Sequence, residues 1–446
     1  MRQVRPLAIG LALLTTALAV AAVPALDGLK VVEKRFDNGM RLVVKPEHRW
    51  GLVSVGLYIR AGSYCETDEN AGVAHLLEHM LFESTERGNG QRLGPAVEAM
   101  GGDIGAHTTR DFTSLEVTIA SQFLPEVLPL LAKAVFDAEI TPSAVALERE
   151  VVARELTDRS EYAEGSLDDM IWGTAFTVHP YRRPIGSTPS QVAGLTLEQV
   201  LAFRQRFYVP GNMALVVVGD VDADALTAQV ADLFGARPAV GYEPPQVLPE
   251  PPQDDIRTMV TTRPGDTVIF SYAWRAPAIT DPVDVCAMDL IYTVLGEGVF
   301  GRLNHALQES GLALMSSVDF LTQRYPGLLI VTVLTTPAED LKARSAVLAE
   351  IKRLREEPLT ADELAEAKRL LGIDYAFNNE AYSDQVGSLG FYEGIDSWRF
   401  ATGYIDSVNA VTAEDISRVA QQYLGLESYT LVVVRPQPRP GETEEA

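Results

Sequence analysis

Two of the six histidines stand four residues apart with a glutamate between them, in the segment His75-Leu-Leu-Glu78-His79. On a helix, positions i and i+4 lie on one face, so both imidazoles can aim at one ion. Glu78 flanks the same face, where it suits a base that takes a proton from an attacking water. Zinc (Zn2+) fits this set, because catalytic zinc has three protein ligands and keeps one position open.

The order His-x-x-Glu-His is the inverted zincin signature. With six histidines in the chain, a chance match that includes the glutamate is expected in roughly one sequence in a hundred or fewer. Apolar neighbours such as Val73, Leu76 and Leu77 would bury this helix, and buried histidine and glutamate need partners. The segment therefore predicts a metal site.

A third ligand is expected on a helix that begins at Thr141-Pro142, where a capping hydroxyl precedes proline. Within it, Glu148 and Glu155 are separated by two helical turns and share a face. Either could bind the metal, and the other would then orient a histidine from outside the ligand set. Without the upstream motif, a solvated face would be the simpler explanation of these glutamates.

The elements that must position these residues occur twice. The alternating segment 53–61 predicts a half-buried strand, and 268–276 repeats it in the second half of the chain. Thr196-Leu-Glu is followed by Leu215-Val-Val-Val, and Thr412-Ala-Glu is followed by Leu431-Val-Val-Val at the same separation. Such matching landmarks indicate an internal duplication.

The Pro-rich stretch 237–256 reads as a linker between two domains, 26–236 and 257–436, with 437–446 as a disordered tail. Helices are expected over 70–83, 91–100 and 143–160. Strands and helices mixed without strict alternation favour an α+β fold in layers.

Residues 1–25 have the plan of a secretory signal peptide: Arg2 and Arg5 precede an apolar run, and small residues follow it. An uncleaved anchor helix is the competing interpretation. The prediction is a periplasmic or secreted protein that has no membrane span after processing.

The amino-acid composition limits the classes of partner and of reaction that fit this chain. Sixty-one acidic against 37 basic residues give a net charge of -24, which disfavours nucleic acid. Nothing in the sequence brings the two cysteines, Cys65 and Cys286, together. A hydrolase with a Cys65 nucleophile is disfavoured, because no histidine outside the metal set is an obvious partner.

The segment His-Leu-Leu-Glu-His-Met-Leu-Phe (75–82) strongly resembles the pitrilysin and mitochondrial-processing-peptidase family of zinc metallopeptidases. In that family a Val-Val-x-x-Glu segment downstream of the second histidine supplies the third ligand. Val151 to Glu155 match this pattern, at the distance from His79 that is usual in the family. The resemblance implies one zinc per chain on His75, His79 and Glu155, with Glu148 outside the ligand set. It also implies two duplicated α+β domains closing like a clamshell around a peptide.

The strand 103–109 resembles the family's edge strand, which adds the substrate peptide as an extra strand. We therefore expect Gly105, Ala106, His107 and Thr108 to bind substrate, with His107 lining the cleft. Family members usually have asparagine where this chain has Gly105.

The second half lacks the motif: Leu290, Thr293 and Val294 stand where the repeat places His75, Glu78 and His79. In the family, the half without a metal site instead has an arginine and a tyrosine that bind the substrate. In this chain, Leu307 and Leu314 stand at those two positions.

These features together predict a zinc-dependent metalloendopeptidase that hydrolyses peptides or unfolded polypeptides. This substrate-binding arginine and tyrosine, the Arg-Tyr clamp, are missing here. The chain is therefore expected to be the catalytic subunit of a heterodimer with a metal-less paralogue that has the Arg-Tyr clamp. A homodimer is the second choice. The alternative function is a non-enzymatic peptide-binding or assembly subunit, in which the motif is typically eroded.

Overall fold

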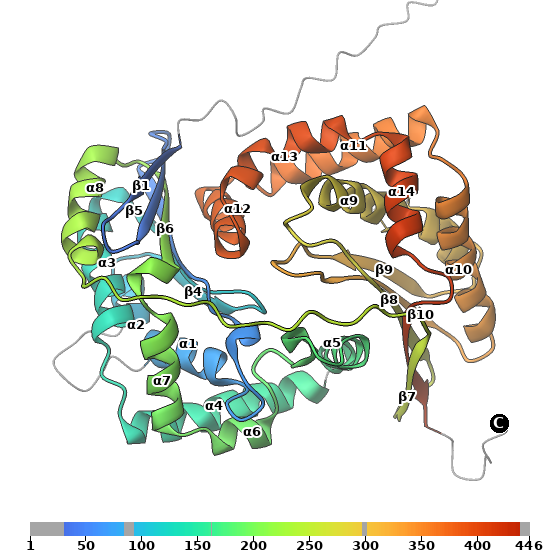
Figure 1. Ribbon diagram of the computed structural model, residues 1–446, viewed down its shortest axis with the longest axis horizontal. Helices are drawn as coiled ribbons and strands as arrows, with labels where there is room; N and C mark the ends of the chain where they lie inside the picture. Colours follow the sequence, from blue (N-terminus) through green and yellow to red (C-terminus); the bar gives the residue numbers. More distant parts are fainter. Residues whose placement is uncertain (1–30, 84–92, 162, 297–300, 438–446) are drawn as a thin grey trace, which may run out of the picture.

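The computed structural model describes residues 31–83, 93–161, 163–296 and 301–437. The predicted signal peptide and all but the first residue of the predicted tail lie outside these ranges. The described chain folds into two α+β halves, each built on one mixed sheet (Figure 1).

The first sheet has six strands in the order β1-β2-β6-β3-β5-β4. Its strands are β1 (Val32–Arg35), β2 (Arg41–Pro46), β3 (Leu52–Ile59), β4 (Asp103–Thr108), β5 (Thr113–Ala120) and β6 (Met213–Gly219). The second sheet has five strands in the order β7-β11-β8-β10-β9. Its strands are β7 (Arg257–Arg263), β8 (Val268–Arg275), β9 (Met315–Phe320), β10 (Leu328–Thr335) and β11 (Thr430–Pro436).

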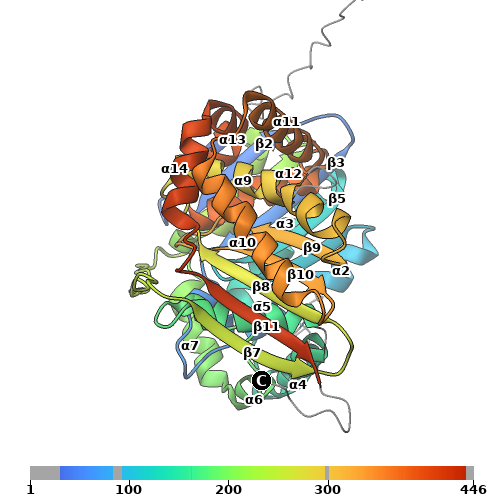
Figure 2. The same cartoon turned by 90° about the vertical axis from the view of Figure 1, so that its right-hand side faces the viewer.

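From β2 onward the two sheets share one topology. The order β2-β6-β3-β5-β4 corresponds to β7-β11-β8-β10-β9, and Figure 2 shows the second sheet's strands running side by side. Within these five strands the first pair, β2-β6 or β7-β11, is parallel and the other pairs are antiparallel. The predicted duplication is therefore visible strand by strand, and the predicted α+β fold is confirmed.

Fourteen α-helices surround the sheets in the described part of the chain. Those of the first half are α1 (Val73–Glu83), α2 (Leu93–Ala99), α3 (Leu124–Ala132), α4 (Pro142–Glu161), α5 (Ala163–Ala175), α6 (Pro189–Gly194), α7 (Leu197–Phe207) and α8 (Ala223–Val230). Those of the second half are α9 (Pro282–Gly296), α10 (Asp340–Glu356), α11 (Ala361–Phe377), α12 (Tyr382–Ile395), α13 (Arg399–Ala410) and α14 (Ala413–Tyr423).

The expected motif helix begins three residues later than predicted, at Val73. Gly72 has φ +93°, a left-handed conformation that a helix cannot continue through. The expected helix over 143–160 is α4, and the Thr141 hydroxyl accepts the amide of Ala144 at its start.

The Val-rich strands β6 and β11, each the last strand of its sheet along the chain, are buried on both faces. In β6, Leu215 and Val217 face the first half's own core, while Val216 and Val218 pack with residues of α12. β11 repeats the pattern, and its Val432 faces the cluster that contains α5. A strand covered on both sides is apolar at every position, which explains the unbroken valine runs.

In each sheet, the face turned away from its own half's core is covered by a helix from the other half. α12 of the second half packs on the first sheet, and α5 of the first half packs on the second sheet (Figure 1). Polar contacts fix the first of these helices. Glu393 on α12 pairs with Arg41 at 2.7 Å and with Arg60 at 3.1 Å, and only 3% of its side chain is exposed.

The linker between the halves runs without helix or strand from Ala236 to Ile256. It is nevertheless anchored through Glu250, whose carboxylate accepts the backbone amides of Thr177, Val178 and His179. The same carboxylate lies 3.3 Å from the guanidinium of Arg275. One linker side chain thus ties both halves together.

Both cysteines are free and buried, Cys65 in the first half and Cys286 in the second. Among the residues with described positions, no helix combines the length and the apolar character needed to cross a bilayer.

Candidate metal centre

Helices α1 and α4 bring three potential ligands together. His75 and His79 lie one turn apart on α1, with their rings in an edge-to-face arrangement and centroids 4.8 Å apart. Glu155 on α4 faces both: its carboxylate oxygens lie 3.6 Å from Nε2 of His75 and 3.2 Å from Nε2 of His79. One ligand atom from each residue lies within 4.8 Å of the other two.

These separations fit a zinc ion. Ligand atoms about 2.0–2.2 Å from a tetrahedral zinc lie about 3.3–3.6 Å from one another. Two imidazole nitrogens and a carboxylate are also a donor set that zinc accepts. Glu155 is 51% exposed, so the group opens toward solvent on one side, as a catalytic site must.

Glu148 lies outside this trio, on the far side of one ring. Its carboxylate is 3.7 Å from Nδ1 of His79, and its side chain is 9% exposed. A carboxylate behind a ligating histidine fixes the tautomer and the ring orientation. The structure therefore separates the two glutamates that helical spacing alone leaves equivalent.

Glu78 lies beside the trio and is buried. The hydroxyl of Thr108, at the end of β4, donates to its carboxylate at 2.6 Å. Burial raises the pKa of Glu78, and this hydrogen bond opposes the rise. A carboxylate with a raised pKa is a better proton acceptor, and the hydroxyl fixes its direction.

The pKa values of the two histidines are shifted in opposite directions. Burial and the neighbouring imidazole lower the pKa of His75 to about 4. Burial also lowers the pKa of His79, but the neighbouring carboxylates of Glu148 and Glu155 outweigh it and raise the value to about 9. The hydrogen bond from His79 holds the pKa of Glu155 below its ordinary value.

The expected substrate strand is β4, which lies at the edge of the first sheet. It pairs on one side with β5, placing Gly105 opposite Glu116 and His107 opposite Ser114. His107 is exposed, Gly105 and Ala106 are half-buried, and Thr108 contacts Glu78. One edge of β4 is thus unpaired among the described strands and lies next to Glu78.

In the second half, the positions equivalent to the motif belong to the hydrophobic core. Leu290 and Thr293 are buried on α9. Leu307 is fully buried in the π-helical turn Asn304–Glu309, while Leu314 is 56% exposed. Neither leucine offers the polar group that a substrate clamp needs.

Two residues near the centre were missed in the sequence. The buried carboxylate of Glu66 accepts the amides of Gly72 and Ala74 at 2.9 Å each, capping the start of α1. Gly186 packs its backbone against the ring of His75. A glutamate so far ahead of a helix is not a recognised cap pattern, and Gly186 is distant from His75 in the chain, so neither gave a local signal.

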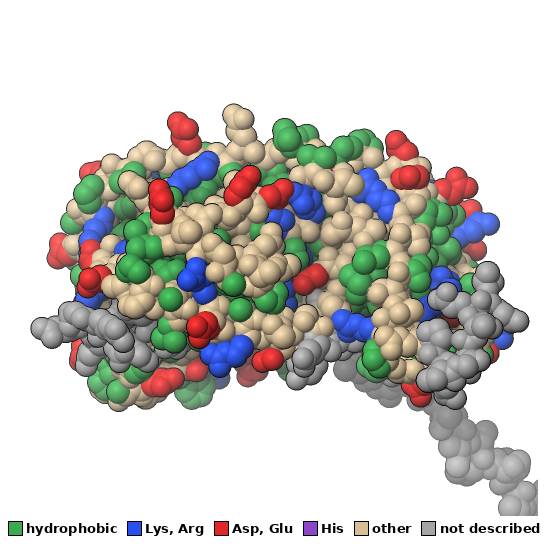
Figure 3. All heavy atoms as spheres, turned by 90° about the horizontal axis from the view of Figure 1, so that it is seen from below, with side chains coloured by type: hydrophobic (Ala, Val, Ile, Leu, Met, Phe, Trp, Pro, Cys, Tyr) green, Lys and Arg blue, Asp and Glu red, His purple; other side chains and the backbone are tan. Residues whose placement is uncertain are grey.

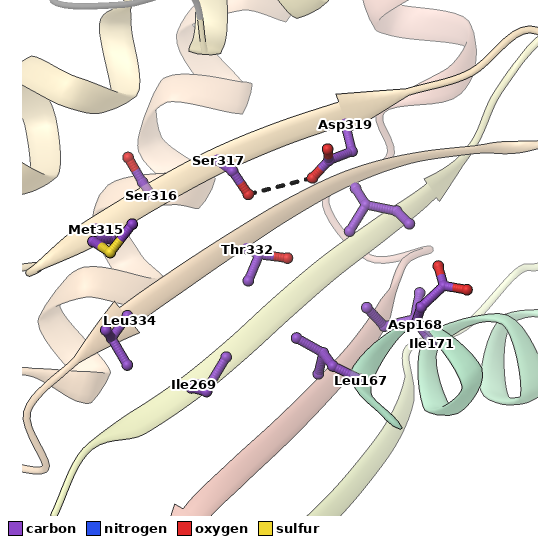
Figure 4. A pocket seen from close by; sticks show the side chains of 11 residues that line it. Leu167, Asp168, Ile171, Ile269, Met315, Ser316, Ser317, Asp319, Thr332 and Leu334 are labelled. Carbon is purple, nitrogen blue, oxygen red and sulfur yellow. Dashed lines mark hydrogen bonds between the residues drawn. The ribbon is translucent and has the colours of Figure 1, made fainter. Parts of the chain in front are cut away.

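A pocket of about 500 Å³ lies apart from the metal ligands, between α5 and the second sheet. Figure 4 shows Leu167 and Asp168 entering from α5, opposite Ser317 and Asp319 on β9. Its lining is mostly apolar, and a hydrogen bond joins Ser317 to Asp319 at 3.3 Å. Asp168 pairs at 3.1 Å with Arg110, which lies in the turn between β4 and β5, so this pocket lies near the end of β4.

Several known proteins are similar to this chain in sequence and in fold. An uncharacterized zinc protease of Mycobacterium bovis is 28% identical over 410 residues, or 90% of this chain and 92% of its own. The crystal structure of a protease from Helicobacter pylori has a TM-score of 0.84 at 25% identity and covers 92% of this chain and 100% of its own. The first half of the periplasmic protease PqqL from Escherichia coli has the same fold, with a TM-score of 0.74 at 21% identity and 93% of each chain covered.

Family models match the two halves separately. Residues 42–189 match the model described as "Insulinase (Peptidase family M16)", and residues 194–371 match the one described as "Peptidase M16 inactive domain". The first match contains the motif helix and Glu155, and the second, which begins near the end of the first half, contains Leu290, Thr293 and Val294, where the second half lacks the metal motif. The resemblance seen in the sequence is thereby confirmed, and this chain belongs to the M16 family of peptidases.

Proposed function

We propose that this chain is a zinc-dependent metalloendopeptidase that hydrolyses peptides or unfolded polypeptides. The observation that carries the proposal is the meeting of His75, His79 and Glu155 within 4.8 Å, with the buried carboxylate of Glu78 beside them. Membership of a peptidase family supports it, since zinc proteases are among the relatives.

Each residue has a distinct role. His75, His79 and Glu155 hold the ion, and Glu148 orients His79. Zinc, when bound, acts as a Lewis acid on the scissile carbonyl and on water. Glu78 takes the proton of the attacking water and passes it to the leaving amine, held in line by the Thr108 hydroxyl. The free edge of β4 holds the peptide backbone in extended form.

The pocket between α5 and the second sheet supports the peptide-binding part of the proposal. Its apolar lining suits an apolar side chain of a peptide that runs along β4. Ser317→Trp should fill the pocket and raise KM for long peptides without changing zinc content, while Ser317→Ala should leave KM unchanged. An unchanged KM in the tryptophan variant removes this pocket from the substrate path.

The test of the main proposal combines metal analysis with hydrolysis of unstructured peptides. We expect one zinc per chain, and we expect Glu78→Gln to keep the zinc while losing at least about 10³-fold in kcat. Glu150→Gln, on the exposed side of α4, is the matched control and should keep full activity. A wild-type chain that binds no zinc, or that binds zinc but cleaves nothing with any partner, supports the non-enzymatic assembly subunit instead.

We also propose that the chain works as the catalytic subunit of a heterodimer with a metal-less paralogue, which supplies the arginine and tyrosine that Leu307 and Leu314 replace. The burial of Leu307 supports this proposal, because a fully buried side chain cannot contact substrate. The purified chain should therefore be weakly active alone and gain activity when the paralogue is added. Full activity alone, as a monomer or as the homodimer kept as second choice, contradicts it.

The site of action that we propose is the periplasm or the exterior. The signal-peptide pattern of residues 1–25 supports it, and the neighbour PqqL is named as periplasmic. N-terminal sequencing of the protein from its host should find a mature start near residue 26. A protein that begins at Met1 in the cytoplasmic fraction contradicts the export.

A further inference from the structure

The two proposed histidine ligands are held by different means. Nδ1 of His79 faces the carboxylate of Glu148. Nδ1 of His75 is buried and has no hydrogen-bond partner among the described residues. A ligating histidine normally has its second ring nitrogen bound by a polar group that fixes the ring. Among the described residues, packing rather than a hydrogen bond therefore restrains this side of the His75 ring.

The atoms behind His75 belong to the backbone of Gly186. A Cβ placed on Gly186 would lie 2.8 Å from Nδ1 of His75 and 2.9 Å from Cδ2 of Leu156. Leu156 directly follows Glu155, so Gly186 fills the space between the two helices that bear the ligands. Contacts this short leave no room for a methyl group.

The loop that contains Gly186 is firmly braced. Gly186 has φ +81°, and Ser187 has φ +66°, the one positive value at a non-glycine residue in the described chain. Arg183 donates to the backbone carbonyl of Glu66 at 2.6 Å and pairs with Asp68 at 3.2 Å. Because Glu66 also caps the start of α1, the loop and the motif helix share one anchor. Strained backbone of this kind persists only where its surroundings hold it in place.

We propose that Gly186 is a positioning residue of the metal centre: its bare backbone is the wall that sets the ring of His75 in the direction of the ion. This inference rests on the proposed zinc function. It assigns to packing the task that Glu148 performs for His79 by a charge-assisted contact.

The test compares glycines that share a backbone conformation but differ in neighbours. Gly186→Ala adds the methyl group that meets His75. Gly311 has φ +75° with no atom within 4 Å of its Cβ position, so Gly311→Ala carries the same backbone strain without the contact. We expect zinc affinity, measured by competition with a chelator, to fall about 10- to 100-fold in Gly186→Ala and less than twofold in Gly311→Ala. Gly186→Asn and Gly311→Asn form a second pair, because asparagine tolerates positive φ and the first pair can lose stability through backbone strain.

The position of the His75 ring in crystals of the metal-free variants is a readout that needs no zinc. A ring that turns or shifts in the Gly186 variants, and stays in place in the Gly311 variants, supports the inference. An unmoved ring, or zinc affinity equal within twofold in both pairs, overturns it. A wild-type chain without zinc affinity contradicts the proposed function, and the ring position then decides the role of Gly186 by itself.

Discussion

At the scale of single residues, three groups contact the proposed ligands or the proposed base without being ligands themselves. Glu148 lies behind His79, Thr108 lies behind Glu78, and Gly186 lies behind His75. Each acts by a different physical means: a charge-assisted contact, a hydroxyl donor and a steric wall. Loss of Glu148 or of the bare backbone at Gly186 should therefore weaken zinc binding, whereas loss of the Thr108 hydroxyl should lower kcat.

Glu148→Gln should weaken zinc binding by about 10- to 100-fold, because an amide is a poorer acceptor for Nδ1 of His79 and lowers the basicity of that ligand. The measurement is zinc affinity by chelator competition. Glu150→Gln, two residues away and exposed on the same helix, is the control and should bind zinc like the wild type. Equal affinities in both variants contradict a role for Glu148.

Thr108→Val should lower kcat about 10-fold with little change in zinc content, because Glu78 loses the 2.6 Å donor that fixes its carboxylate. Thr108→Ser keeps a hydroxyl and should retain most of the activity. Steady-state kinetics with a fixed peptide separate the two variants. If the valine and serine variants are equally impaired, the hydroxyl is not what matters.

At the scale of elements, the linker is held to the two halves by the side chain of Glu250. Only 5% of the side chain of Glu250 is exposed, and it accepts three consecutive backbone amides. Burial alone raises the pKa of Glu250, but these hydrogen bonds outweigh it and lower the value to about 2. An ionised carboxylate is therefore part of the folded structure.

Because the folded pKa of Glu250 is depressed, its contribution to stability is present above the ordinary value near 4.5 and is lost as pH falls toward 2. The contribution amounts to at most about 3 kcal/mol. Glu250→Gln should lower the free energy of unfolding at pH 7 and flatten its fall between pH 4.5 and 2. Denaturant titrations across that range measure both effects. Glu243→Gln, exposed in the same linker, should follow the wild-type curve.

At the scale of the whole molecule, the exchanged helices make the two halves interdependent. Without α12 the second face of the first sheet would be exposed, and without α5 the same would happen to the second sheet. On the face shown in Figure 3, acidic and basic side chains are interspersed, and no patch of one sign gathers there.

The exchange predicts that the chain unfolds in one cooperative transition, visible as a single calorimetric peak. Glu393→Ala should lower the free energy of unfolding by about 3–5 kcal/mol, because it removes the carboxylate that pairs with Arg41 and Arg60 in the contact between the halves and leaves Arg60 only its backbone carbonyl acceptors. Glu366→Ala, in a half-exposed ion pair on α11, should cost less than about 1 kcal/mol. Two separate transitions, with only one shifted by Glu393→Ala, contradict the interdependence.

The sequence by itself determined the features that are encoded locally. Helical periodicity places His75 and His79 on one face, alternation marks β3 and β8, and recurrence at a nearly constant offset reveals the two halves. These patterns depend on neighbours a few residues apart, or on copies that can be aligned, so no tertiary information is needed to find them.

Only the tertiary structure decided which residues meet across long separations. Spacing leaves Glu148 and Glu155 on the same face, and it is the packing of α4 against α1 that sets one toward both Nε2 atoms and the other behind His79. The wall at Gly186 and the exchange of α5 and α12 likewise join segments far apart in the chain. The physical reason is that a helix periodicity specifies a face but not its neighbour, and the neighbour is chosen by how the whole core packs.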